Sequence, residues 1–173
     1  MKRRAHQPLV VAMGHLLGDR CRIGLAGKAV DCVVPLPVPL RRRALGTFDR
    51  CSILAQCVAL RLDRPYRHIL KYRRTPRKQG LLTPRQRRLN VRGAFGTRTR
   101  YAIRGRRLLL VDDVLTTGAT ACEAARTLLS AGAGRVDLAV VARAMPPSST
   151  DTPPSVSRPA ETPSTVAGFP PDA

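Results

Sequence analysis

Two adjacent carboxylates, Asp112 and Asp113, follow a run of four apolar residues and precede a Thr-Thr-Gly-Ala-Thr sequence at 116–120. The short apolar run is typical of a strand that is buried on both faces of a parallel sheet. We therefore expect the two carboxylates at the carboxyl end of that strand, where open α/β sheets bind their ligands. Carboxylates at such a place can bind hydroxyl groups or a hard cation.

The segment after the carboxylates has the composition of a phosphate-binding loop. Thr116, Thr117 and Thr120 carry hydroxyl groups, and Gly118 can adopt a positive φ. Residues 121–130 are predicted to form a helix, and a helix N-terminus favours an anion. Hydroxyl-binding carboxylates beside a phosphate-binding loop suit a sugar phosphate. The alternative is a buried strand, a polar turn and a helix that bind no ligand.

Helices and strands alternate around this segment. Helices are predicted at 7–22 and 52–62, and short strands at 31–36, 69–70 and 136–142. The alternation predicts an α/β fold with an open, mostly parallel sheet flanked by helices. Residues 73–92 lack apolar periodicity, and we expect a mobile loop there with a helical turn near 84–89.

Positive charge dominates the composition. The chain has 31 Lys and Arg against 11 Asp and Glu, a formal net charge of +20. The segment from Arg64 to Arg107 contains 14 Arg and two Lys but no acidic residue. A field of this kind attracts polyanions such as pyrophosphate or nucleic acid. A compositional preference for Arg over Lys is the alternative explanation, although it does not account for the missing acidic residues.

The chain divides into two parts by composition. Residues 146–173 are rich in Pro, Ser and Thr, which predicts a disordered tail after a domain at 1–145. The five cysteines form no C-x-x-C pair, which argues against a zinc site. Their odd number, without a recognisable signal peptide, indicates reduced thiols and a cytoplasmic location. Cys122 is expected to pack against the domain from the helix at 121–130. No apolar stretch has the length of a membrane span.

The segment 108–120 resembles the phosphoribosyl-diphosphate (PRPP) signature of type I phosphoribosyltransferases. Residues 33–145 as a whole resemble the ComF family within that superfamily. The matching motifs are Val34-Pro35-Leu36-Pro37 with Arg41–Arg43, the loop 73–81, Arg87–Phe95, Gly132-Ala133, Val136–Val141 and Ala142-Arg143. The chain departs at 46–50, where it shares only Phe48 with the usual family pattern. It also lacks the N-terminal four-cysteine zinc element of many members, so we expect a short form or a truncated gene product.

The resemblance implies a PRPP site with Mg²⁺ as the cofactor. Asp112 and Asp113 would hold the ribose hydroxyls, partly through the metal, and would be the catalytic residues. The PRPP phosphate would be bound by the loop formed by Thr116, Thr117, Gly118, Ala119 and Thr120. The pyrophosphate group would meet residues from two other segments. These are Pro35, Leu36, Pro37, Arg41, Arg42 and Arg43 in the first, and Arg73, Arg74 and Lys78 in the second. For the arginines and lysine, a solvated basic surface is the alternative.

The resemblance implies transfer of phosphoribose to an unknown acceptor, with pyrophosphate as the leaving group, and a link to DNA uptake in natural transformation. Purine-salvage members of the superfamily carry an acidic base at the position of Thr116, which argues against hypoxanthine or guanine as the acceptor. Alternatives are a non-catalytic accessory protein that binds single-stranded DNA and a decayed homologue. Against DNA binding, aromatic residues make up only 3% of the chain. The sequence leaves the oligomeric state open, and a homodimer is compatible with it.

Overall fold

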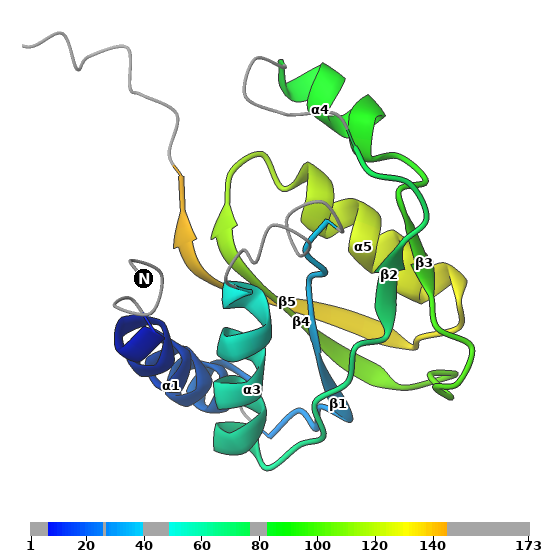
Figure 1. The fold of residues 1–173 in the computed structure, drawn as a ribbon. Coiled ribbons are helices and arrows are strands. Elements are labelled where there is room, and N and C mark those ends of the chain that lie inside the picture. The colour runs from blue at the N-terminus through cyan, green and yellow to red at the C-terminus, as the bar shows by residue number, and fades with distance from the viewer. Residues whose placement is uncertain (1–6, 26, 40–48, 77–82, 145–173) are drawn as a thin grey trace, which may run out of the picture.

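The computed structural model describes residues 7–25, 27–39, 49–76 and 83–144 (Figure 1). A parallel sheet of three strands, in the order β1-β4-β5, consists of β1 (Cys32–Pro35), β4 (Arg107–Leu115) and β5 (Arg135–Arg143). The helices are α1 (Gln7–Gly24), α3 (Arg50–Leu62), α4 (Pro84–Val91) and α5 (Ala119–Ser130). The expected α/β fold with an open parallel sheet is confirmed. A separate antiparallel pair is formed by β2 (Leu70–Tyr72) and β3 (Phe95–Thr97).

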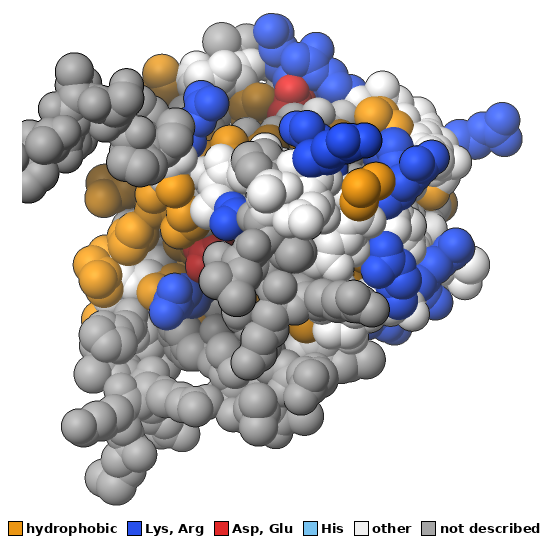
Figure 2. Space-filling view, turned by 90° about the horizontal axis from the view of Figure 1, so that it is seen from above, with side chains coloured by type: hydrophobic (Ala, Val, Ile, Leu, Met, Phe, Trp, Pro, Cys, Tyr) orange, Lys and Arg blue, Asp and Glu red, His pale blue; other side chains and the backbone are white. Residues whose placement is uncertain are grey.

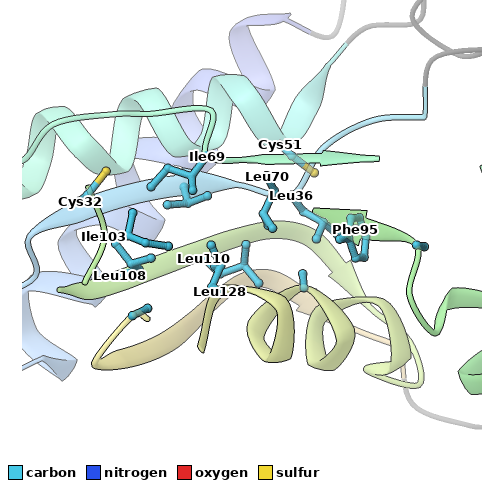
Figure 3. Close-up of a cluster of buried hydrophobic side chains, with 14 residues drawn as sticks. Cys32, Leu36, Cys51, Ile69, Leu70, Phe95, Ile103, Leu108, Leu110 and Leu128 are labelled. Carbon is cyan, nitrogen blue, oxygen red and sulfur yellow. The ribbon is translucent and has the colours of Figure 1, made fainter. Parts of the chain in front are cut away.

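Strand β4 is buried on both faces of the sheet, as its continuous apolar run predicts. Leu108 and Leu110 belong to a core cluster that includes residues of α5 and of the β2–β3 pair (Figure 3). Leu109 and Val111 point to the opposite face and pack in a second cluster with residues of α1 and α3. The alternation follows from the two-residue period of a strand. It fixes the position of β4 and of the residues that follow the apolar run.

Helices α1 and α3 pack closely because two glycines of α1 face α3. A Cβ atom added at Gly14 would lie 2.7 Å from the Cβ of Cys57 and 3.4 Å from the Cα of Leu54. At Gly18 it would lie 2.6 Å from the Cβ of Arg61. Side chains at these two positions would therefore push the helices apart.

Replacement of Gly14 by Leu is expected to destabilise the fold by about 1–3 kcal/mol, the usual cost of overfilling a packed interface. Gly24→Leu is the matched control, because nothing lies within 4 Å of a Cβ atom there. Urea denaturation of the two variants and the wild type measures the difference. Equal stability of the two variants would contradict the close packing of the helices.

The described part of the basic segment between β2 and β3, residues 73–76 and 83–94, contains more regular structure than its composition predicts. The helical turn expected near 84–89 is the eight-residue helix α4, and it begins with a capping box. Thr83 accepts a hydrogen bond from the backbone N–H of Gln86, whose side chain accepts one from the N–H of Thr83. Strand β3 was not expected. Residues 77–82, in the middle of the predicted loop, lie outside the described residues.

None of the helices within the described ranges combines the length and hydropathy that a membrane crossing requires. The tail predicted at 146–173 lies outside the described residues, as does Met145.

Candidate functional site

Asp112 and Asp113 lie directly after the last residue of β4 that pairs with β1. Pairing with β1 ends at Val111, opposite Pro35, whereas pairing with β5 continues to Leu115. The strand runs two residues beyond Asp113, so the carboxylates lie near its carboxyl end, as expected, but are not its last residues. They are nevertheless placed at the carboxyl end of the sheet, because β1 stops before them.

Asp112 is the buried member of the pair, with 8% of its surface exposed. Its Oδ1 atom accepts a hydrogen bond of 2.8 Å from the backbone N–H of Asp113. The same atom accepts one from the Cys51 thiol, with a sulfur–oxygen distance of 3.4 Å. Burial, followed by the negative charge of Asp113, raises the pKa of Asp112 to about 6. The two hydrogen bonds therefore do not fully offset the cost of burying the negative charge of Asp112.

Asp113 faces outward, with 35% of its side chain exposed. Its Oδ1 accepts a hydrogen bond of 2.8 Å from the backbone N–H of Val114. Its Oδ2 lies 3.7 Å from Nη1 of Arg50, whose side chain is largely exposed. An ion pair of this length in contact with water contributes little to stability. Asp113 is thus available to a ligand.

The first turn of α3 brings Arg50 and Cys51 to the carboxylates. Asp49 caps this helix by accepting hydrogen bonds from the backbone N–H and the hydroxyl of Ser52. The expected helix at 52–62 therefore begins two residues early, at Arg50. Sequence reasoning missed both site residues. Cys51 is 61 positions from its partner Asp112, and nothing in the local pattern signals the contact.

The threonine loop connects β4 to α5 and opens toward solvent. Thr116 and Thr117 are exposed, Thr120 is half-buried and Ala119 is buried. Gly118 occupies the N-cap position of α5 with φ 73°, a left-handed conformation that favours glycine. The first N–H groups of a helix have no acceptor within the helix. The loop therefore presents hydroxyl groups and backbone donors together, as expected for an anion-binding segment.

Replacement of Gly118 by Ala is expected to cost about 1–2 kcal/mol, since a left-handed backbone disfavours a Cβ atom. Space is not limiting, because the nearest atom to the added Cβ lies 3.7 Å away. Gly118→Asn is the matched variant and should cost less, because Asn tolerates this conformation. Thermal denaturation of both variants checks the order. Greater stability of the Ala variant would contradict the left-handed geometry.

The candidate residues for pyrophosphate are placed unevenly. Pro35, Leu36 and Pro37 lie at and directly after the end of β1, beside the carboxyl end of β4. The Leu36 side chain is in the core, so only its backbone can reach a ligand. Its N–H already donates a hydrogen bond of 2.9 Å to the carbonyl of Val111. Arg41, Arg42 and Arg43 lie outside the described residues.

The two described arginines of the second segment make local contacts. Arg73 packs against Gly96 of β3, since a Cβ atom added there would lie 2.5 Å from the Arg73 Nε. Arg74 donates a hydrogen bond to the carbonyl of Arg92 at the end of α4. Both side chains are thereby engaged with the β2–β3 pair and α4. Lys78 lies outside the described residues.

A second buried carboxylate, Glu123, joins α5 to the turn before β3. It is 8% exposed and accepts hydrogen bonds from the N–H of Gly93 at 2.6 Å and from Arg126. These donors lower the pKa of Glu123, with Arg126 having the largest effect. Sequence reasoning did not single out Glu123.

Cys122 lies on the same helix, α5, and its side chain is exposed. The expectation that Cys122 packs against the domain was therefore wrong.

A model of the phosphoribosyl transferase domain matches residues 45–165, which is more than half of the chain. The chain belongs to the phosphoribosyltransferase family. The match includes the carboxylates of β4, the threonine loop and α5. It agrees with the resemblance drawn from residues 108–120.

Sequence similarity to curated proteins shows that this phosphoribosyltransferase-like protein is ComF-like. The DNA utilization protein YhgH of Escherichia coli O157:H7 is 31% identical over 116 residues, or 66% of this chain and 50% of that protein. Competence protein ComFC of Bacillus subtilis is 37% identical over 100 residues, or 58% of this chain and 39% of that protein. The chain thus spans about half the length, or less, of these relatives.

The fold is also shared with solved phosphoribosyltransferases. Adenine phosphoribosyltransferase from Saccharomyces cerevisiae superposes with a TM-score of 0.52 at 16% identity, covering 80% of this chain and 68% of that one. At such identity the likeness concerns the fold alone.

Proposed function

We propose that this protein binds PRPP at the carboxyl end of β4 and is a phosphoribosyltransferase. The observation that carries the proposal is the sequence of groups along one β–α unit. Asp112 and Asp113 are followed, after four intervening residues, by Gly118, which has a left-handed conformation and is the N-cap of α5. Two carboxylates for the ribose hydroxyls and a loop of donors for the phosphate therefore lie next to each other.

Each part of the ligand has a chemically suitable partner in this proposal. The 2′- and 3′-hydroxyl groups donate to the carboxylates of Asp112 and Asp113. The 5′-phosphate accepts hydrogen bonds from backbone N–H groups of the threonine loop and from the hydroxyls of Thr117 and Thr120. The pyrophosphate group lies toward Pro35–Pro37, with Arg41–Arg43 and the segment of Arg73, Arg74 and Lys78 supplying positive charge.

The donor set also suits the proposed cofactor, Mg²⁺. Asp112 and Asp113 offer the hard oxygen ligands that this ion prefers. One of them is half-exposed, which leaves room for substrate hydroxyls. When bound, Mg²⁺ would offset negative charge on the leaving pyrophosphate.

The proposed reaction breaks the bond between C1 of the ribose and the pyrophosphate oxygen. Pyrophosphate leaves with the bonding electrons, and a nucleophilic acceptor forms the new bond to the electron-poor C1. The carboxylates would hold the ribose in place while basic side chains stabilise the departing charge. The acceptor is unknown. Thr116 carries no carboxylate, so its side chain does not supply a base to take a proton from the acceptor.

A link to DNA uptake is the second element of the proposal, supported by the names of the ComFC and YhgH relatives. The alternative function is non-catalytic binding of single-stranded DNA. A specific observation favours it: Lys and Arg side chains gather on one side of the surface shown in Figure 2, the side on which α4 and the β2–β3 pair lie in Figure 1. Exposed arginines of these elements and their flanks include Arg73, Arg74, Arg85, Arg88 and Arg92.

One double variant separates the two functions. Asp112→Asn with Asp113→Asn is expected to abolish PRPP binding and to leave DNA binding unchanged or slightly stronger, because it only removes negative charge. Fluorescence anisotropy with labelled single-stranded DNA, measured at several salt concentrations, monitors the second property. If wild type binds DNA but not PRPP, the accessory function replaces the transferase.

A further inference from the structure

We propose that Cys51, Asp112 and Asp113 together form a direct binding site for a thiophilic divalent cation of the Zn²⁺ class. Ligand atoms of these three residues all lie within 4.8 Å of one another. Binding of the cation stands independently of the proposed function. Only its consequence, competition with PRPP for the same carboxylates, rests on that function.

The spacing of the first two ligands already fits a tetrahedral zinc ion. Zinc lies about 2.3 Å from thiolate sulfur and about 2.0 Å from carboxylate oxygen, which places the two ligand atoms about 3.5 Å apart. The observed distance between Sγ of Cys51 and Oδ1 of Asp112 is 3.4 Å. Asp113 must move by about 1 Å to complete the set, and it would exchange its hydrogen bond from the Val114 N–H and its 3.7 Å ion pair with Arg50 for the bond to the metal.

Burial separates the two inner ligands from the outer one. Cys51 and Asp112 are each 8% exposed, so the two inner ligands are shielded from water. Asp113 borders solvent, which gives the ion an entrance and leaves a place for water as the fourth ligand. Cys51 enters the cluster from the first turn of α3, at the end of the core that also holds Leu36 (Figure 3). Burial and the charges of Asp112 and Asp113 raise the pKa of the Cys51 thiol, so the thiol is protonated until the cation binds. On binding, the proton is released to solvent and the sulfur forms the bond to the metal.

The thiol changes which metal the carboxylates prefer. Two carboxylates alone suit a hard ion such as Mg²⁺, whereas a sulfur ligand selects Zn²⁺ and other soft or borderline cations. A cation held by all three residues would occupy the oxygen atoms proposed for the ribose. Zinc would therefore exclude PRPP, and the protein would be inhibited by this metal.

Cobalt spectroscopy of the full chain tests the site directly. Co²⁺ added to the metal-free protein is expected to give a sulfur-to-cobalt charge-transfer band in the near ultraviolet. Cys51→Ser keeps a hydrogen-bond donor to Asp112 but removes the sulfur, and it should abolish the band. Cys122→Ser is the matched control, because this thiol is exposed and lies outside the cluster. It should leave the band unchanged.

Affinity gives a second readout. Competition with a zinc chelator should show that Cys51→Ser weakens Zn²⁺ binding by about 100-fold, whereas Cys122→Ser leaves it unchanged. Cadmium NMR of the wild type alone should show a thiolate ligand, so a misfolded variant does not prevent the test. Absence of sulfur ligation in the wild type, or a band that persists in Cys51→Ser, would overturn the proposal. If sulfur ligation occurs and PRPP does not bind, the metal site stands and the proposed function fails.

Discussion

Asp112→Asn is expected to stabilise the fold at neutral pH while abolishing PRPP binding. In the wild type the carboxyl group is buried beside a second carboxylate, which raises its pKa to about 6. Asn keeps an oxygen that can accept from the Asp113 N–H and the Cys51 thiol, but it carries no charge. The variant therefore lacks the carboxylate that is proposed to hold the ribose. It also avoids the free-energy cost of burying that negative charge.

The pH dependence has a definite sign. A carboxyl whose pKa is higher in the folded than in the unfolded state binds its proton more tightly when folded. The stability it contributes is complete below pH 3.8, the ordinary value for Asp, and is lost as the pH rises through about 6. The loss is on the order of a few kcal/mol. Asp112→Asn removes this dependence.

Urea denaturation at pH 4.5 and pH 7.5, combined with PRPP calorimetry, checks both effects. The advantage of Asp112→Asn over the wild type should grow between the two pH values. Asp113→Asn is the matched comparison: it should also weaken PRPP binding, but its half-exposed position predicts a smaller gain in stability. An Asp112→Asn protein that is less stable than wild type at pH 7.5, or that binds PRPP normally, would contradict this account of the site.

Leu110→Ala is expected to destabilise the fold by about 2–5 kcal/mol. Leu110 is fully buried in the centre of β4, between Val34 of β1 and Leu138 of β5 in the sheet register. Removal of its side chain leaves a cavity directly behind the carboxylates. Leu60→Ala is the matched control, because Leu60 is 75% exposed and its loss should cost less than about 0.5 kcal/mol.

Chemical denaturation of the two leucine variants gives the comparison. A second effect is expected if the core positions the site: Leu110→Ala should weaken PRPP binding even where the protein remains folded. Similar losses of stability in both variants would contradict the assignment of β4 as the buried central strand.

The central β–α unit was predictable because its signals are local. Four consecutive apolar residues predict a strand that is buried on both faces. The two carboxylates, the three threonines and the glycine that follow, placed before a predicted helix, are typical of a ligand-binding loop. The structure confirms the strand and the helix of this unit, and a left-handed conformation at Gly118. The length of β4 was missed because β5 continues to pair with it beyond Asp113.

The remaining features depend on contacts between distant segments. Cys51 contacts Asp112 because α3 packs beside the sheet, and no sequence pattern near either residue predicts this contact. Strand β3 has three residues, including a glycine, and exists through its pairing with β2. Helix α4 has almost no apolar face, although the Thr83–Gln86 capping box was a readable signal.

Titration calorimetry of PRPP into the full chain, with and without Mg²⁺, tests the central claim most directly. The account predicts Mg²⁺-dependent binding that disappears in the Asp112→Asn, Asp113→Asn double variant. Circular dichroism of the same samples should show that both proteins are folded. Absence of PRPP binding by the folded wild type, at any Mg²⁺ concentration, would contradict the proposal that this end of β4 is a phosphoribosyl site.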